Sequence, residues 1–455
     1  MTDTLHFPVI IIGGGGAGLC AALAVRDNDT EVLVIERDGT PMGSTAMSTG
    51  LIPAAGTAEQ IAAGIEDSPE RFTNDILSKT KGRTDADIAL RLARESADTV
   101  AWMRDTHAVP LSLVDGFLYP GHTAKRMYGT PNRSGTELMG ALLAACERQD
   151  VTILTNATVT ELLSEDERIT GIRYQTPDGA SETVTCDALI LACCGFGGNA
   201  EMVAHWIPEM ADATYHGHPG NKGDAIRWGQ SLGAAVADMS AYQGHGGLAA
   251  GFGIPILWPL IMEGGYQVNA NGQRFSNEAA GYSEQAANVN AQPGHVAWSI
   301  FDQRLHELMM NFDDYQQAWS AGAVTTASTL EEMAAIRNLP VEALLETQSE
   351  VDACVAGRRD DAFGRDFTGK PPLKAPYYSA KVTGALFHTQ GGLVVDENGR
   401  VLKEDGSPFA NLYAAGGAAR GVSGDGADGY MAGNGLLTAT TFGKLAGRAA
   451  SNSSC

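Results

Sequence analysis

The first 36 residues of the chain limit its fold more than any other stretch. Residues 8–12 (PVIII) have the character of a strand, a glycine turn follows, residues 16–27 have the character of a helix, and residues 31–36 (EVLVIE) again that of a strand. A strand, a helix and a second strand in this order predict a βαβ unit, which requires a parallel sheet and a right-handed crossover. We therefore expect an α/β protein built on a Rossmann-like parallel sheet.

The glycine turn between the strand and the helix has the spacing of a dinucleotide site. Gly13, Gly15 and Gly18 fit the pattern G-x-G-x-x-G, in which the backbone approaches a pyrophosphate at the helix N-terminus. Glu36 ends the second strand, where a carboxylate accepts hydrogen bonds from ribose hydroxyls. The predicted cofactor contacts of this region are Gly13, Gly15, Gly16, Ala17, Gly18, Glu36 and Arg37.

Two further segments indicate which dinucleotide binds. Residues 41–50 (PMGSTAMSTG) are small and hydroxylic, as a flavin or pyrophosphate lying along a backbone requires. Residues 411–421 (NLYAAGGAARG) end a strand in glycines, and the helix expected from about residue 435 can offer its positive end to a flavin. A nicotinamide domain needs neither segment, so we expect FAD, bound non-covalently because residues 41–50 contain no histidine to tether it. The predicted contacts are Ser44, Thr45, Ala46, Gly50, Gly416, Asn434, Leu436 and Leu437.

Residues 188–200 (ALILACCGFGGNA) offer a competing interpretation. They approximate a strand followed by G-x-G-x-x-A, which would suit a second nucleotide fold for NAD(P)H. No second βαβ unit with a terminal acid follows them, which favours a return strand of the FAD domain.

The character of the sequence changes near residue 240. Residues 241–300 are rich in glycine and alanine with apolar and aromatic islands, and residues 327–358 have a helical pattern. Strand-like signals return at residues 391–417, before the C-terminal helix. We expect an FAD-binding domain formed by residues 1–242 and 377–455, interrupted by an α+β capping and catalytic domain at residues 243–376.

Charge and cysteine content exclude several classes of function. A net charge of −23 argues against nucleic acid or an anionic membrane as a partner. The seven cysteines show no CxxC spacing and no Cys/His cluster, so no metal, iron–sulfur or haem site is expected. The apolar stretch that begins at residue 9 is short and broken by glycines, and MTDTLHFP lacks the positive charge of a signal peptide. These features predict a cytoplasmic protein with no integral membrane segment.

The motifs together resemble the fumarate reductase/succinate dehydrogenase flavoprotein superfamily. GGGGAG, GSTAMSTG, ILACCGFGGN, NANGQRFSNEAAGY, HTQGG, NLYAAGG and GYMAGNG occur in the order of that superfamily, over nearly the whole chain. The resemblance implies an FAD domain completed by both ends of the chain, an inserted capping domain and an active site over the isoalloxazine ring.

The fumarate-reducing branch matches this chain in part. His245 and His388 fall where that branch has histidines near its dicarboxylate. After RFSNE, however, that branch has an arginine where this chain has Gly281-Tyr282, and it has a second arginine where this chain has residues 429–431 (GYM). A dicarboxylate needs two positively charged side chains to bind its carboxylates, so the sequence disfavours fumarate chemistry.

The branch of 3-ketosteroid and cyclic-ketone dehydrogenases has tyrosines at these positions. Tyr282 matches its proton-abstracting tyrosine, Tyr430 the tyrosine that hydrogen-bonds the substrate carbonyl, and Tyr119, more loosely, an assisting tyrosine. Removing the α-proton of a ketone requires a donor on the carbonyl that stabilises the developing enolate. A backbone N–H near Gly433 or Asn434 can help Tyr430 in this. Arg274 is the cation nearest to Tyr282 in the sequence and the candidate to lower the pKa of its phenol.

We therefore expect an FAD-dependent oxidoreductase that acts on CH–CH groups. It would introduce a C=C bond α,β to the carbonyl of a cyclic ketone, a 3-ketosteroid or a smaller ring, passing the proton to Tyr282 and the hydride to FAD N5. The electron acceptor would be external, because no haem or iron–sulfur motif is present. The alternatives are a reductase of an unsaturated acid or enone and an NAD(P)H:FAD oxidoreductase.

Several candidate residues have a purely structural alternative. Tyr282 can be a packing residue, and His245 and His388 can be satisfied core histidines instead of substrate contacts. Trp258, in residues 251–261 (GFGIPILWPLI), can belong to an apolar lid over a ring substrate or to a buried strand pair.

Overall fold

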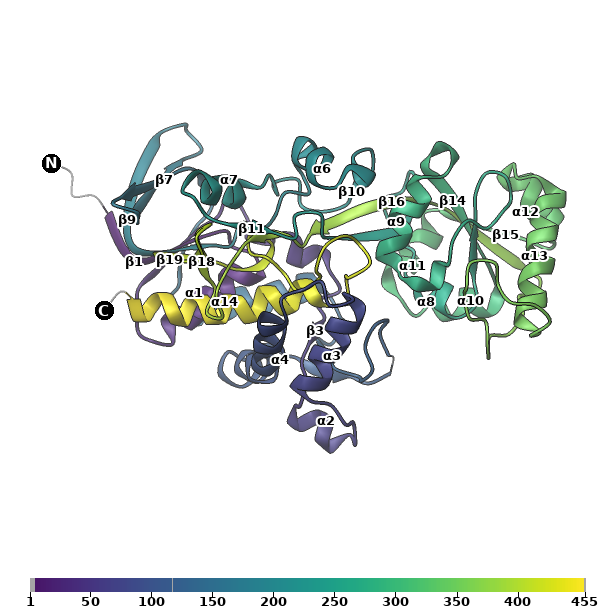
Figure 1. Ribbon diagram of the computed structural model, residues 1–455, viewed down its shortest axis with the longest axis horizontal. Coiled ribbons are helices and arrows are strands. Elements are labelled where there is room, and N and C mark those ends of the chain that lie inside the picture. Colours follow the sequence, from purple (N-terminus) through teal and green to yellow (C-terminus); the bar gives the residue numbers. More distant parts are fainter. Residues whose placement is uncertain (1–4, 117, 454–455) are drawn as a thin grey trace. The chain divides into compact units, whose positions relative to one another are not determined.

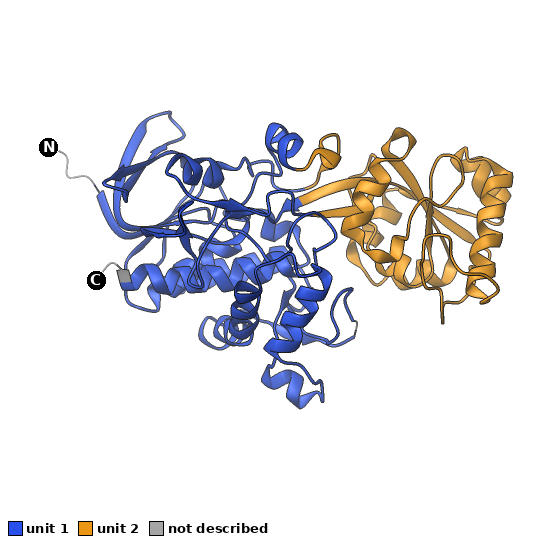
Figure 2. Cartoon of the chain, in the orientation of Figure 1, with its two compact units in different colours: residues 1–206, 217–242, 388–455 blue, residues 207–216, 243–387 orange. Residues whose placement is uncertain are grey.

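The computed structural model describes residues 5–116 and 118–453 (Figure 1). The chain forms two compact units (Figure 2). The first unit contains residues 1–206, 217–242 and 388–455, and the second contains residues 207–216 and 243–387. No helix of the described part of the chain is long and apolar enough to cross a membrane.

The first unit is built on a mixed sheet with a parallel centre. The strand order is β18-β19-β9-β1-β2-β6, and β7 and β8 extend the sheet from β9. Every neighbour pair from β19 to β6 is parallel, whereas β18 runs antiparallel to β19. The strands are β1 (Leu5–Ile12), β2 (Val32–Ile35), β6 (Thr152–Leu154), β7 (Thr158–Glu165), β8 (Arg168–Gln175), β9 (Ser181–Leu191), β18 (Arg400–Leu402) and β19 (Pro408–Ala414).

The N-terminal βαβ unit is confirmed. Helix α1 (Gly16–Arg26) joins β1 to β2, and Ile10 of β1 lies opposite Leu33 of β2. On its other side, Ile10 lies opposite Leu189 of β9. The stretch that offered a second nucleotide fold is therefore a strand of the same sheet, as the return-strand interpretation requires.

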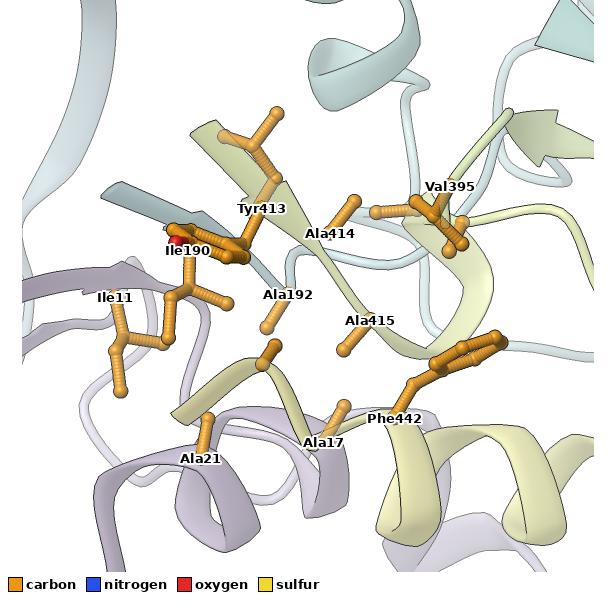
Figure 3. Packing of buried hydrophobic residues seen from close by; sticks show 14 of the residues in the cluster. Ile11, Ala17, Ala21, Ile190, Ala192, Val395, Tyr413, Ala414, Ala415 and Phe442 are labelled. Atoms are coloured by element: carbon orange, nitrogen blue, oxygen red, sulfur yellow. The ribbon is translucent and has the colours of Figure 1, made fainter. Parts of the chain in front are cut away.

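The C-terminal helix completes the first unit by packing closely on α1. Helix α14 (Asn434–Ser453) brings Gly443 against α1, where an added Cβ would lie 2.5 Å from the carbonyl oxygen of Ala17. Small side chains, including Ala17, Ala192 and Ala415, occupy the junction of these helices with the sheet (Figure 3). Two segments from opposite ends of the sequence thus share one core.

The remaining elements of the first unit are short. A three-stranded sheet has the order β3-β5-β4, and a two-stranded sheet pairs β11 with β17. These elements are β3 (Ile52–Pro53), α2 (Ala58–Ala62), α3 (Pro69–Lys79), α4 (Ala86–Ala101), β4 (Ser112–Val114), β5 (Met127–Gly129), α5 (Gly135–Arg148), α6 (Ala200–Trp206), α7 (Asp224–Ser231), β11 (Val236–Ala237) and β17 (Gly392–Leu393).

The second unit is an α+β structure around the long strand β16. The sheet has the order β10-β16-β14-β13, and β12 and β15 also pair with β16. Its strands are β10 (Thr214–Tyr215), β12 (Tyr242–Ala249), β13 (Tyr266–Val268), β14 (Val296–Asp302), β15 (Val324–Ala327) and β16 (Tyr377–Thr389). Its helices are α8 (Pro259–Met262), α9 (Tyr282–Asn290), α10 (Gln303–Met309), α11 (Asp313–Ser320), α12 (Leu330–Arg337) and α13 (Val341–Val355).

The helical pattern at residues 327–358 corresponds to two helices instead of one. Asn338 adopts a left-handed conformation (φ +54°) after the end of α12, and Pro340 precedes the start of α13. An αL residue followed by a proline ends a helix, so the pattern is divided there.

The unit boundaries differ from the sequence-based ones at two places. The sequence analysis drew its second boundary between residues 376 and 377, where β16 begins. Residues 377–387 belong to the second unit, and so do residues 207–216, whose strand β10 runs parallel to β16.

Candidate active site

The first unit contains a cavity at the carboxyl ends of β1 and β2. This is the position at which ligands bind in open α/β sheets. The predicted cofactor residues that line the cavity are Gly13, Gly15, Gly16, Ala17, Glu36, Arg37, Ser44, Thr45, Gly416 and Leu436. His388, predicted as a substrate contact, lines it as well, whereas Gly18, Ala46, Gly50, Asn434 and Leu437 do not.

The glycine turn has the shape that a dinucleotide needs. Gly13 has a φ of +105°, and an added Cβ would lie 2.6 Å from the carbonyl oxygen of Ala192, so only glycine fits. An added Cβ at Gly15 would meet nothing within 4 Å, which leaves the backbone open to the cavity. The first turn of α1 contains no acidic residue, so its positive end suits a pyrophosphate.

Glu36 is held in place by backbone amides. Its Oε2 accepts a hydrogen bond from the N–H of Gly14 (2.7 Å), and its Oε1 accepts one from the N–H of Asp38 (2.9 Å). The carboxylate is buried and fixed at the end of β2, and its remaining lone pairs can accept from ribose hydroxyls. The residues present therefore fit FAD.

Another part of the cavity wall was not predicted from the sequence. His218 Nε2 lies 2.9 Å from the carboxylate of Asp38, and Asn221 Nδ2 donates to Ser44 Oγ at 2.8 Å. The carbonyl oxygen of Gly220 accepts from Arg37 Nη1 at 2.9 Å. The run HPGNKGD at residues 218–224, rich in turn-forming residues before α7, was the available signal.

In the first unit, Tyr430 lies next to a neutral histidine. The rings of Tyr430 and His388 are 5.6 Å apart and edge-on. Burial lowers the pKa of His388 to about 4, so the imidazole is uncharged at neutral pH. Its Nδ1 lies 2.9 Å from Gln390 Nε2 and 3.3 Å from the Thr389 carbonyl oxygen. The shorter contact makes Nδ1 an acceptor, which leaves the proton on Nε2 as a donor.

A chain of hydrogen bonds orients Gln390. The hydroxyl of Ser423 donates to Gln390 Oε1 (2.9 Å), and Asn434 Nδ2 donates to Ser423 Oγ (3.3 Å). Asn434 Oδ1 is buried with no partner among the described residues. The side chain of Asn434, predicted as a cofactor contact, therefore supports His388 through Ser423 and Gln390.

The two backbone amides that the sequence suggested as carbonyl donors differ in their hydrogen bonding. The N–H of Asn434 donates to the Met431 carbonyl oxygen at 3.1 Å. The described residues offer no acceptor to the N–H of Gly433, whose backbone has a φ of +83°. Of the two amides that the sequence suggested as carbonyl donors, Gly433 is thus the one that remains.

Tyr119 packs against the same loop. Its side chain contacts the buried cluster formed by Leu51, Val114, Met127 and Ala432. Burial raises the pKa of Tyr119, and the nearby charge of Arg133 opposes the shift only in part. Its phenol therefore stays protonated and can exchange hydrogen bonds or provide an apolar wall, but it cannot act as a base.

In the second unit, Tyr282 belongs to an aromatic cluster. It is the first residue of α9, and its ring lies 5.4 Å from that of His245 and 6.3 Å from that of Trp258. The rings of His245 and Trp258 are 5.6 Å apart and edge-on, and Phe387 stacks on His245 at 5.2 Å. Trp258 is buried within this cluster.

His245 is also neutral. Burial, with a smaller contribution from His216, lowers the pKa of His245 to about 3. Its Nδ1 accepts from the N–H of Gly247 at 3.1 Å, so Nε2 carries the proton. His245 can donate a hydrogen bond but cannot supply a positive charge.

The expectation that Arg274 lowers the pKa of Tyr282 is not supported. Arg274 is nearly buried and pairs with Glu278 (2.9 Å) and Asp361, so two carboxylates neutralise its charge. The peptide dipoles of α9 direct their positive end toward Tyr282, and Glu284 in the same turn opposes that field.

Comparison with known proteins identifies the family. A family model described as an FAD binding domain matches residues 8–436. The chain belongs to this FAD-binding family. It is 28% identical over 443 residues to a probable fumarate reductase of Shewanella frigidimarina, covering 96% of this chain and 74% of that protein.

The structural neighbours include two kinds of enzyme. An open conformation of a flavocytochrome c3 fumarate reductase has a TM-score of 0.84 at 27% identity, covering 100% of this chain and 79% of that one. A 3-ketosteroid-Δ4-(5α)-dehydrogenase of Rhodococcus jostii has a TM-score of 0.79 at 24% identity, covering 99% and 98%. The second likeness shows the fold alone.

Membership of the FAD-binding family confirms the α/β flavoprotein fold, FAD as the cofactor and a flavin-dependent oxidoreductase that acts on CH–CH groups. The relatives found by sequence include fumarate reductases, an NADH:acrylate oxidoreductase and a vinyl phenol reductase, whereas the ketosteroid dehydrogenases occur among the structural neighbours. The choice between the two chemistries therefore depends on the site residues.

Proposed function

We propose that this flavoprotein introduces a C=C bond next to the carbonyl of a cyclic ketone. The observation that carries the proposal is the pair of tyrosines, Tyr282 and Tyr430, each beside a neutral histidine. Neutral donors and aromatic rings suit an uncharged ring substrate, and they offer little to a dianion.

The arginines near these positions support the same conclusion. In the second unit, Arg365 is buried and lies 3.2 Å from the carboxylate of Glu278, which also binds Arg274. In the first unit, Arg420 binds Asp238 (2.7 Å) and Asp85 (3.4 Å). A dicarboxylate needs guanidinium groups that are not already neutralised. Arg274, Arg365 and Arg420 are each paired with a carboxylate and therefore do not meet this condition.

Each tyrosine has a distinct role in the proposed reaction. The phenol of Tyr430 and the N–H of Gly433 donate to the substrate carbonyl and stabilise the enolate charge that develops there. Tyr282 then takes the α-proton as general base. FAD, held by the cavity residues named above, would supply the acceptor for the hydride of the β-carbon, and an external electron acceptor would complete the turnover.

A second candidate is the reverse reaction, reduction of an unsaturated acid or enone. The fumarate reductases among the sequence relatives favour it. Because forward and reverse reactions share one transition state, Tyr282 would then deliver the proton that it takes in the forward direction.

The two candidates are separated by anaerobic flavin reduction. The purified holoenzyme is mixed in separate cuvettes with a cyclohexanone-type ketone, a 3-ketosteroid, succinate and NADH, and flavin absorbance is followed. We expect bleaching by a ketone, lost in Tyr282→Phe and kept in Tyr266→Phe. Tyr266 is a matched control, because its hydroxyl is buried in the same unit and donates only to Gln348 (2.9 Å). Bleaching by succinate or NADH alone would overturn the proposal.

A further inference from the structure

We propose that His122, held by Arg126, is a positioning residue for the carbonyl donors. It fixes the direction of the Ala432–Gly433 peptide and thereby presents the N–H of Gly433 to the substrate oxygen. The inference rests on the proposed ketone chemistry and adds to it two residues that the sequence did not indicate.

The hydrogen bonds of His122 define its tautomer. Its Nδ1 lies 3.1 Å from Arg126 Nη1, and its Nε2 lies 2.9 Å from the carbonyl oxygen of Ala432. A guanidinium has only donors, so Nδ1 accepts and Nε2–H donates to Ala432. Burial, followed by the charge of Arg126, lowers the pKa of His122 to about 4. The neutral tautomer is therefore the one present at neutral pH.

Arg126 is itself rigidly held. It is fully buried, with Nε and Nη2 on the two oxygens of Asp67 (2.9 and 2.8 Å) and Nη1 on Asp75 (2.6 Å). Its guanidinium also lies 4.5 Å from the ring centre of Phe72. A bidentate, desolvated pair of this kind fixes orientation as well as position. The donor that faces His122 therefore cannot rotate away.

Peptide geometry transmits this constraint to Gly433. In a planar trans peptide the C=O and N–H bonds point in opposite directions. His122 holds the Ala432 carbonyl, so the N–H of Gly433 must point away from His122. An added Cβ at Gly433 would lie 2.8 Å from Pro53 Cδ, so the loop is closely packed at this residue as well. The peptide has little freedom to flip.

The turn that contains His122 also packs against the residues that precede Gly433. His122 lies in a turn with Tyr119, whose carbonyl oxygen accepts from the His122 N–H at 3.1 Å. An added Cβ at Gly121 would lie 2.9 Å from Met431 Cγ, so this turn contacts the residue after Tyr430 closely. One turn thus supports both proposed carbonyl donors, the Tyr430 phenol and the Gly433 amide.

The test compares His122→Phe and His122→Gln in the holoenzyme. His122→Phe removes the donor, whereas His122→Gln keeps an N–H near the position of Nε2. His107→Phe is the matched control, because His107 is also buried in the first unit but packs against Trp102. The readouts are the C=O stretching frequency of a carbon-13-labelled cyclic ketone bound to the oxidised enzyme, measured by infrared difference spectroscopy, and the rate of flavin reduction.

We expect the wild type and His107→Phe to lower the C=O frequency of the bound ketone relative to the free ketone. His122→Phe should raise that frequency back toward the free value and slow flavin reduction about 10- to 100-fold, less than the roughly 100- to 1000-fold cost of removing an oxyanion donor outright. His122→Gln should recover most of both effects. A purely structural role would leave the carbonyl frequency unchanged.

Two outcomes overturn the inference in distinguishable ways. If the wild type reduces its flavin with a ketone and His122→Phe and His122→Gln keep the wild-type frequency and rate, His122 does not position Gly433, and the proposed function stands. If no ketone binds to the wild type or reduces its flavin, the proposed function fails and this inference with it. If His122→Phe does not retain FAD, His122→Asn takes its place, because the shorter side chain also withdraws the donor from the Ala432 carbonyl. A raised C=O frequency in His122→Asn supports the inference, and a wild-type frequency contradicts it.

Discussion

The two units hold a histidine beside a tyrosine in contrasting ways. In the first unit, His388 next to Tyr430 is oriented by Gln390, which is held in turn by Ser423 and Asn434. In the second unit, His245 next to Tyr282 is oriented by the N–H of Gly247 and by stacking on Phe387. Both histidines are neutral Nε2–H donors, but a side-chain network fixes one and local backbone and aromatic packing fix the other.

This difference matches the two parts of the proposed reaction, which are stabilisation of the carbonyl oxygen and transfer of the α-proton. The region of Tyr430 is rich in hydrogen-bond donors, which is what a carbonyl oxygen gaining negative charge requires. Aromatic rings surround Tyr282, and the charge of Arg274 is neutralised by its paired carboxylates. This region is therefore suited to pack against the ring of the substrate and to transfer one proton. Variants of each region should therefore fail in different ways.

The largest effect is expected from Tyr282→Phe. Loss of a general base should slow ketone-driven flavin reduction about 1000-fold, while the phenyl ring preserves the packing with His245 and Trp258. Stopped-flow absorbance at saturating ketone measures the rate, and the C=O frequency of the bound ketone should not change. A changed frequency would contradict the separation of roles.

Tyr430→Phe should show the opposite pattern. Loss of one carbonyl donor is expected to slow flavin reduction about 100-fold and to raise the C=O frequency of the bound ketone. Infrared difference spectra and stopped-flow rates check both effects. An unchanged frequency together with a reduced rate would assign Tyr430 a role in proton transfer instead.

Gln390→Leu tests the hydrogen-bond network that orients His388 in the first unit. Leucine has a similar volume but no donor for His388 Nδ1, so the tautomer of His388 is no longer fixed, and we expect about a 10-fold loss in rate. Thr389→Val, at the preceding residue, which is the last of β16, is a control for a change of side chain at the end of this strand. Nitrogen NMR of labelled histidine distinguishes the tautomers. A retained Nε2–H tautomer would show that burial alone selects it.

The smallest effect is that of pH on the stability of the fold. His388, His245 and His122 have pKa values lowered to about 4, 3 and 4 by burial, whereas an unfolded histidine has a pKa of about 6.5. Below about pH 6.5 the unfolded chain binds more protons, so stability should fall as the pH drops from about 6.5 toward 4, by at most about 1.4 kcal/mol per pH unit for each histidine.

Melting temperatures of the wild type and of His245→Gln across this pH range measure the effect. The variant should have the shallower pH dependence, because it lacks one of the groups that must charge on unfolding. The rate of flavin reduction should show no step from these histidines between pH 6 and 8. Identical slopes for the two proteins would show that His245 is not held neutral.

Local patterns in the sequence predicted the frame of the cofactor site. The glycine spacing and Glu36 depend on neighbours within one βαβ unit, and the structure places them at one cavity. His218 and Asn221 escaped prediction because they reach that cavity from a segment about 180 residues beyond Arg37. Their turn-rich local pattern indicates a turn before α7 but not its return to this cavity.

The role expected of Arg274 failed for a related reason. Proximity in sequence made it the natural cation for Tyr282, but Asp361, 87 residues later, pairs with it. The support of Ala432 by His122 likewise spans 310 residues. Charge neutralisation and backbone orientation are set by tertiary contacts, which a single sequence does not reveal.

The close packing of α14 on α1 has a consequence for synthesis on the ribosome. The ribosome makes β1 about 400 residues before β19 and α14, which supply the core beneath the cavity and, from α14, part of its wall. Until α14 has been made, the nascent chain carries an incomplete FAD site with exposed apolar strands. FAD can be held only after that point, so flavin supply and chaperones during this interval should govern the yield of holoenzyme.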